Sequence, residues 1–165
     1  MAKVIIGVMG AGKSATPEDI SLAYNLGKSI AENNWILLTG GRKAGIMDAA
    51  SRGAKASGGL TIGILPSNNT KDMSEAVDIP IITDMGNGRN NINVLSSTVV
   101  VACGIGLGTA SEIALALKNN KPVILLNATD LTYQFFDSLA SNQIFLAENI
   151  DNAIALIKEI IINVK

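Results

Sequence analysis

Short apolar runs alternate with longer amphipathic segments along almost the whole chain. The runs, which are rich in Ile, Val and Leu, predict strands at 3–9, 35–40, 60–65, 78–83, 98–103, 122–127 and 143–148. The segments between them predict helices near 17–33, 45–57, 88–97, 108–119, 131–140 and 149–164. Apolar strands separated by helices of roughly 10 to 15 residues are typical of βαβ units. We therefore expect one Rossmann-like α/β domain over residues 1–165, with a mostly parallel sheet of about seven strands and helices on both faces.

Two of the predicted helices are more apolar than a small single domain requires. In the segment 108–118, apolar residues lie on nearly every side, which predicts a helix that is buried all round. The last helix carries a heptad-like stripe with a further isoleucine beside it: Ile157, Ile160, Ile161 and Val164, with Ile162 off the stripe. Either these residues only fill the core, or they form a subunit interface; we expect a homo-oligomer, a dimer or a tetramer.

Composition and charge narrow the classes of function. The net charge of -1 argues against a general nucleic-acid binder. Neither a run of 18 apolar residues nor a charged-then-apolar leader is present, so we expect a cytoplasmic protein without a membrane partner. The single cysteine, Cys103, suits a reducing compartment and reads as a small core residue. The absence of histidine excludes a Ser-His-Asp triad and a His-ligated metal, and we expect no metal held by the protein.

The stretch GVMGAGKS at 7–14 fits the phosphate-loop pattern of nucleotide hydrolases. In such enzymes the helix begins at the Gly-Lys-Ser itself, so that its amides meet the phosphate. Here the helix start signals come later, in TPED at 16–19, where Thr can cap the helix and Pro can begin it. The chain is therefore not expected to hydrolyse ATP or GTP. Gly10 and Gly12 still let the backbone approach a ligand at the end of the first strand, with Lys13 beside them.

Three more glycine-rich segments follow predicted strands: GGRKAGIM, DMGNGRNNIN and GIGLGTASE. Their candidate ligand contacts are Gly40, Gly41, Arg42, Lys43, Ala44 and Gly45 in the first, Gly86, Arg89, Asn90 and Asn93 in the second, and Gly106, Leu107, Gly108, Thr109 and Glu112 in the third. The plain alternatives are tight turns with solvated cations, helix caps, and an acid that only favours a helix dipole. Backbone amides, an arginine and amide side chains suit an anion or a purine-like edge, and a charge in an apolar helix is rare unless paired. Since parallel strands end at one edge, all four segments predict one cleft for a nucleotide-like or pterin-phosphate ligand.

The same segments carry a family resemblance. LLTGGRKAGIMDAASRGA, GGLTIGILP, DMGNGRNNINVLSS and GIGLGTASEIALALKNNKPVILL resemble, in this order, the SLOG superfamily that contains the LOG proteins, over roughly residues 3–127. LOG enzymes are phosphoribohydrolases that release cytokinin bases from nucleoside monophosphates. Their signature is P-G-G-x-G-T-x-x-E with an upstream Arg-Lys, so the resemblance implies catalytic roles for Arg89 and Glu112.

This chain departs from the LOG signature at three positions. Gly104 and Ile105 replace the Pro and the first Gly, and Asn90 replaces the Lys. Hydrolysis needs an acid that stabilises a developing oxocarbenium ion while an anion site holds the phosphate. Because the loop that aims these groups is altered, the resemblance implies weak hydrolase activity or none.

A branch of the superfamily is more similar. VIIGVMG, GIMDAASRGA, TIGILP, GRNNIN and GTASEIALALK, in order, resemble the molybdenum cofactor carrier proteins and their bacterial relatives, above all in the Arg-Asn-x-Ile-Asn run at 89–93. Those homo-oligomers bind and protect a phosphorylated pterin dithiolene without known chemistry on it. The resemblance implies a carrier of the molybdenum cofactor (molybdopterin), with molybdoenzymes or cofactor-biosynthesis proteins as possible partners. A LOG-type hydrolase of nucleoside monophosphates is the alternative, and a DNA-processing relative fits least because no basic patch with aromatic residues appears.

Overall fold

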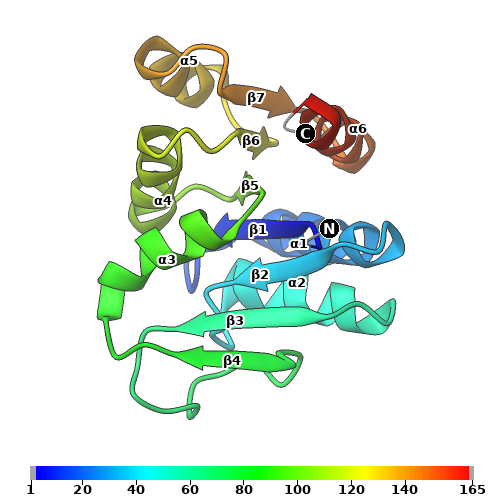
Figure 1. Cartoon of the computed structure of the whole chain (residues 1–165), viewed down its shortest axis with the longest axis vertical. Helices are drawn as coiled ribbons and strands as arrows, with labels where there is room; N and C mark the ends of the chain where they lie inside the picture. Colours follow the sequence, from blue (N-terminus) through cyan, green and yellow to red (C-terminus); the bar gives the residue numbers. More distant parts are fainter. Residues whose placement is uncertain (1–2, 164–165) are drawn as a thin grey trace.

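A computed structural model describes residues 3–163 of the chain. Its seven strands form one sheet in the order β4-β3-β2-β1-β5-β6-β7, and every neighbouring pair is parallel (Figure 1). The strands are β1 Ile5–Gly10, β2 Ile36–Thr39, β3 Thr61–Leu65, β4 Ile79–Ile82, β5 Val99–Cys103, β6 Val123–Leu126 and β7 Ile144–Ala147. The helices are α1 Pro17–Glu32, α2 Gly45–Ala56, α3 Arg89–Ser96, α4 Leu107–Lys118, α5 Asp130–Leu139 and α6 Ile150–Asn163, with a 3-10 turn, η1, over Gly86–Gly88. The predicted α/β class, strand positions and two-faced helix arrangement are confirmed, and the sheet is parallel throughout.

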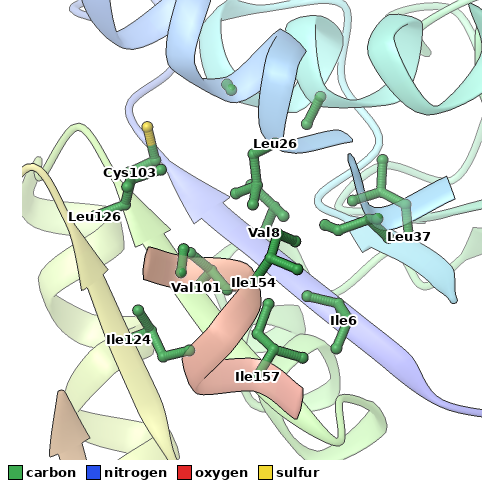
Figure 2. Close-up of a cluster of buried hydrophobic side chains, with 14 of the residues drawn as sticks. Ile6, Val8, Leu26, Leu37, Val101, Cys103, Ile124, Leu126, Ile154 and Ile157 are labelled. Carbon is green, nitrogen blue, oxygen red and sulfur yellow. The ribbon is translucent and has the colours of Figure 1, made fainter. Parts of the chain in front are cut away.

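Alternate residues of each buried strand face opposite layers of helices. Val8 of β1 joins the core under α1, α2 and α6, whereas its neighbour Met9 joins the core under α3, α4 and α5. Figure 2 shows the first of these cores, in which Leu26 of α1 and Ile157 of α6 pack against strand residues. Both faces of the sheet are therefore covered, which explains why the central strands read as continuous apolar runs rather than as alternating ones.

Helix α1 begins after the segment that fits the phosphate-loop pattern and not within it. Thr16 is the N-cap: its Oγ1 accepts from the amide of Asp19 at 3.1 Å, and its own amide donates to the Asp19 carboxylate at 3.1 Å. This capping box places the helix start at Pro17, three residues after the Gly-Lys-Ser. Lys13 and Ser14 therefore lie in a loop outside the helix, as the sequence predicts.

The two unusually apolar helices differ from expectation in this single chain. In α4 one face is buried, through residues such as Ile113 and Ala116, while Leu107 at its start is 94% exposed. The expectation of a helix buried all round therefore does not hold within one chain. In α6, Ile157 and Ile160 pack into the chain's own core, so this stripe is core rather than a free surface. Val164, the last member of the predicted stripe, lies outside the described residues.

The polar connection between β3 and β4 is tied to the loop after β2. The amide of Lys43 donates to the carbonyl of Asp72 at 2.7 Å, and the amide of Ser74 donates to the carbonyl of Gly41 at 2.9 Å. The Ser74 hydroxyl also donates to the carboxylate of Asp48 in α2 at 2.7 Å. These bonds fix the shape of the Arg42 segment, which faces the site described next.

Candidate functional site

A cleft of about 200 Å³ opens at the carboxyl ends of β1, β2 and β5. It lies where the strand order reverses, because β2 and β5 flank β1 on opposite sides. Open α/β sheets bind their ligands at such a switch point. The cleft is lined by Val8, Met9, Gly10, Ala11, Gly12, Ser14, Gly40, Arg42, Met47, Asn87, Arg89, Asn90, Gly106, Leu107, Gly108, Thr109 and Glu112.

The first turn of α4 forms an anion-binding corner of the cleft. Its N-cap is Gly106, which has no side chain to satisfy the first amides. Among the described residues, no hydrogen-bond acceptor meets the amides of Leu107, Gly108 and Thr109, whereas the next amide donates back to Gly106 at 2.8 Å. The hydroxyl of Thr109 is buried there and has no hydrogen-bond partner within residues 3–163. Free amides, the positive end of a helix dipole and an unsatisfied hydroxyl together favour an anionic oxygen.

Arg89 connects the start of α3 to the ends of two strands. Its Nη1 donates to the carbonyls of Gly40, after β2, and Ile64, in β3. The side chain is 6% exposed, and burial lowers the pKa of its guanidinium to about 10, a shift that Glu112 opposes and Arg42 reinforces. The group is thus positively charged at neutral pH. Its Nε is buried with no hydrogen-bond partner in the described chain.

Glu112 brings a buried carboxylate to the same cleft. It lies on the buried face of α4, is 8% exposed, and accepts from Nδ2 of Asn93 at 2.9 Å. Burial raises the pKa of its carboxyl, while the Asn93 bond and the charge of Arg89 act in the opposite direction. Glu112 and Arg89 thus reach the cleft from neighbouring helices, and the charge of Arg89 favours the ionised form of the carboxyl against its burial.

Asn90 lies one residue beyond Arg89 and also borders the cleft. Its Nδ2 donates to the hydroxyl of Ser111 at 2.9 Å, and that hydroxyl donates to the carbonyl of Gly108 at 2.7 Å. A chain of bonds thus runs from α3 into the first turn of α4, beside the anion-binding corner. It holds the amide of Asn90 in one orientation.

Most of the predicted contacts line the cleft, and seven do not. Lys13, Gly41, Lys43, Ala44, Gly45, Gly86 and Asn93 are outside the lining. Lys43 pairs with Glu75, and the amide of Ala44 donates to the carbonyl of Arg42 at 2.8 Å. The amide of Ile46 donates to the carbonyl of Ala11 at 3.0 Å. The amide of Ala44, one of the predicted contacts, and the nearby amide of Ile46 therefore both donate to carbonyls of the protein itself.

Several lining residues have no counterpart among the predicted contacts. The thioethers of Met9 and Met47 provide an apolar part of the wall, Ser14 a hydroxyl and Asn87 an amide. Met47 lies in the first turn of α2, directly after the predicted loop, so its position in the sequence offered a signal. Met9 offered none, because an apolar residue near the end of a strand usually belongs to the core.

Among residues 3–163, no helix combines the length and apolar character that a membrane span requires. Over the same residues, His, Cys, Asp and Glu side chains do not gather in threes as a metal site requires. Cys103 at the end of β5 is fully buried in the core, and burial raises the pKa of its thiol to about 12. It is therefore a core thiol rather than a reactive one.

Solved structures with this fold include proteins that bind the molybdenum cofactor. The molybdenum cofactor binding protein from the phototrophic bacterium Rippkaea orientalis is 62% identical with a TM-score of 0.95, covering 98% of this chain and 99% of its own. The molybdenum cofactor carrier protein from Chlamydomonas reinhardtii is 49% identical with a TM-score of 0.92, covering 97% and 99%.

A more distant relative is an enzyme. A cytokinin riboside 5'-monophosphate phosphoribohydrolase from Rhodococcoides fascians is 26% identical over 83% of this chain and 80% of its own length. The similarity to both groups agrees with the SLOG and LOG resemblance of the four glycine-rich segments. The model of the SLOG cluster4 family matches residues 3–154, and the chain therefore belongs to the SLOG cluster4 family.

Proposed function

We propose that this protein is a carrier that binds the molybdenum cofactor, protects it and hands it on, without chemistry of its own. The observation that carries the proposal is the anion-binding corner at the start of α4, where free amides and the buried Thr109 hydroxyl meet in one cleft with Arg89. This corner suits the phosphate of a phosphorylated pterin. The two solved cofactor-binding proteins, which match nearly the whole chain, support the same ligand.

The dimensions of the cleft fit a carrier. Pockets that enclose a drug-sized ligand measure roughly 300 to 1,000 Å³, whereas this cleft measures about 200 Å³. It can hold the phosphate and part of the heterocycle, and the remainder of the ligand would lie at the mouth. The thioethers of Met9 and Met47 offer soft, polarisable contacts to a heteroaromatic face. A ligand that remains partly accessible can pass to another protein.

The alternative is a LOG-type hydrolase of nucleoside 5'-monophosphates. It is favoured by Arg89 and Glu112, which meet in the cleft as the LOG signature implies. Three hydrogen bonds weigh against it. The Nη1 of Arg89 already serves two backbone carbonyls, and Glu112 already accepts from Asn93. Both side chains are thus held in place by hydrogen bonds within the protein. This suits the binding of a ligand better than proton transfer during hydrolysis.

The deciding experiment combines cofactor analysis with an assay for base release. The protein is purified from a host that makes the cofactor, and bound molybdenum and pterin are measured by mass spectrometry and absorption. The same preparation is incubated with AMP, and released adenine is measured. We expect both molybdenum and pterin to co-purify and no adenine to appear.

A matched variant separates the two functions. Glu112→Ala should abolish turnover in a hydrolase, because a catalytic acid is lost, but should weaken cofactor binding only modestly in a carrier with many contacts. Adenine release at a useful rate from metal-free protein, sensitive to this substitution, would overturn the carrier proposal. Glu159→Gln on α6, outside the cleft, controls for a change of charge alone.

The proposed carrier has further attributes that follow from the resemblance. We propose that it is a cytoplasmic homo-oligomer, a dimer or a tetramer, and that it exchanges the cofactor with molybdoenzymes or with proteins of cofactor biosynthesis. The supporting observation is the exposed apolar surface of α5 and of the start of α4, which includes Leu131, Phe135, Leu139 and Leu107. Exposed apolar patches of this kind mark contact surfaces between proteins.

A further inference from the structure

Two side-chain contacts join α3 to α4 along the cleft. Asn90 meets Ser111, and three residues later on α3 Asn93 meets Glu112, the residue after Ser111 on α4. Positions three apart on a helix share a face, so the two contacts are neighbouring rungs between the helices. Asn90 and Glu112 also line the cleft, and both are at least nine-tenths buried.

The direction of the hydrogen bond between Asn90 and Ser111 is fixed by the neighbouring bond of Ser111 to Gly108. The carbonyl of Gly108 can only accept, so the Ser111 hydroxyl uses its one proton there. That hydroxyl must then accept from Asn90, which identifies the amide atom facing it as Nδ2. The carbonyl oxygen Oδ1 of Asn90 is therefore the atom that remains for a ligand.

In the contact between Asn93 and Glu112, the asparagine is again the donor. A carboxylate only accepts, so the atom of Asn93 that faces Glu112 is Nδ2, and it occupies one carboxylate oxygen. The other oxygen of Glu112 remains for a ligand. In both contacts the amide donors are used inside the protein and acceptor atoms remain for a ligand. Arg89 beside them carries a buried Nε that has no partner in the described part of the chain.

We propose that Glu112 and Asn90 select ligands with a 2-amino-4-oxopyrimidine edge, the edge shared by pterin and guanine. Such an edge presents a ring N–H and an exocyclic amino group, two adjacent donors, next to a carbonyl acceptor. The acceptors of Glu112 and Asn90 match the two donors, and a donor of Arg89 matches the carbonyl. The inference rests on the proposed function for the class of ligand, and it adds which edge is recognised and by which residues.

The same arrangement rejects close analogues. An adenine edge places an acceptor nitrogen beside a single amino group, so one buried acceptor of the protein would face another acceptor. A hypoxanthine edge keeps the ring N–H but lacks the exocyclic amino group, which leaves one buried acceptor unpaired. A buried polar group without its partner is costly, which makes the discrimination large for a small change in the ligand.

Binding of three nucleotide probes to the full-length protein tests the inference. GMP, IMP and AMP are titrated by calorimetry into cofactor-free protein, since GMP and IMP differ only by the exocyclic amino group. We expect GMP to bind roughly tenfold or more tightly than IMP, the usual effect of a hydrogen bond to a charged acceptor. AMP should bind more weakly than GMP.

A pair of variants assigns the preference to the residue. Glu112→Gln keeps the shape and the Asn93 bond but turns an amide donor toward the ligand's donors, so the preference for GMP over IMP should fall to about one. Glu159→Gln makes the same chemical change on α6 and should leave the preference unchanged. The ratio reports recognition, because a merely structural role of Glu112 would weaken both nucleotides alike. Should Glu112→Gln fail to fold, the ratio in the unaltered protein still decides.

Two results would overturn the inference: equal binding of GMP and IMP, or no measurable binding of GMP. The outcome is independent of the carrier test. Co-purified cofactor with equal nucleotide binding would leave the carrier function standing and remove the assigned roles of Asn90 and Glu112. A clear preference for GMP in a protein that never co-purifies with molybdenum would support the assigned roles of Asn90 and Glu112 and remove the carrier function.

Discussion

The Thr109 hydroxyl is a single polar group whose surroundings define a site. The residue is 2% exposed, and its oxygen has no hydrogen-bond partner among the described residues. A buried hydroxyl left unpaired costs about 1 to 3 kcal/mol, so its position at the free amides of α4 is informative. The buried side chains of Arg89 and Glu112 differ from Thr109, because each already has a hydrogen-bond partner in the protein: the carbonyl of Gly40 for Arg89, and Asn93 for Glu112.

At this scale we predict the effect of removing the hydroxyl. Thr109→Val keeps the shape of the side chain but removes the donor, so binding of GMP should weaken by about three- to tenfold. The melting temperature of the free protein should stay the same or rise, because an unsatisfied polar group is lost. Calorimetry and thermal unfolding measure the two effects. Thr109→Ser retains the hydroxyl and should bind like the unaltered protein; equal binding by the valine variant would exclude Thr109 from the anion site.

Helices α1 and α2 approach so closely that glycine is required between them. A Cβ atom at Gly53 of α2 would lie 1.9 Å from the carbonyl oxygen of Tyr24, and one at Gly27 of α1 would lie 2.1 Å from that of Ala50. These are contacts with backbone, so the helices themselves would have to separate. The start of α2 contributes Met47 to the cleft, and the close contact therefore also supports the site.

For this pair of elements we predict a clear loss of stability. Gly53→Ala should lower the free energy of unfolding by about 1 to 3 kcal/mol, as overpacking does, despite the better helix propensity of alanine. Urea unfolding followed by circular dichroism measures the change. Asn25→Ala, at an exposed position of α1, is the matched control and should cause no loss. An unchanged midpoint for Gly53→Ala would contradict the described approach of the helices.

At the scale of the whole molecule, one group of exposed apolar residues lies on α5. Phe135 in the middle of α5 is 58% exposed, and Leu131 and Leu139 lie four residues to either side of it. They are spaced four residues apart, as in a stripe along one face of α5, and α5 lies near β6 and β7 at one edge of the sheet (Figure 1). The isoleucine stripe of α6, by contrast, packs into the chain's own core.

We therefore predict a mass in solution that is a multiple of the 17.1 kDa chain. Light scattering coupled to size-exclusion chromatography measures it. Replacing the exposed aromatic residue, as in Phe135→Asp, should shift the protein toward smaller species if α5 lies in the interface, with an unchanged circular dichroism spectrum. Ile162→Asp on α6 is the control at another exposed apolar position. A monomer at all concentrations would contradict the prediction of a homo-oligomer.

The sequence by itself determined the order and type of the seven strands and six α-helices, because most strands are apolar runs buried in the sheet and the helix signals are local. The capping box at Thr16 shows this best: four residues were enough to place the start of α1. The sequence also predicted that glycine-rich loops would meet at one edge, since parallel strands have one carboxyl edge. It did not indicate the 3-10 turn η1, nor that the apolar residues of β4 lie at an exposed edge of the sheet.

Only the tertiary structure decided which groups remain free in the cleft. The amides of Ala44 and Ile46 donate to the carbonyls of Arg42 and Ala11, whereas the first amides of α4 have no acceptor among the described residues. Likewise, a stripe of isoleucine on α6 and one of leucine and phenylalanine on α5 look alike in sequence, yet one is core and the other surface. The physical reason is the same in both cases: hydrogen-bond partners and packing partners come from segments distant in the chain, and their positions are set by the fold.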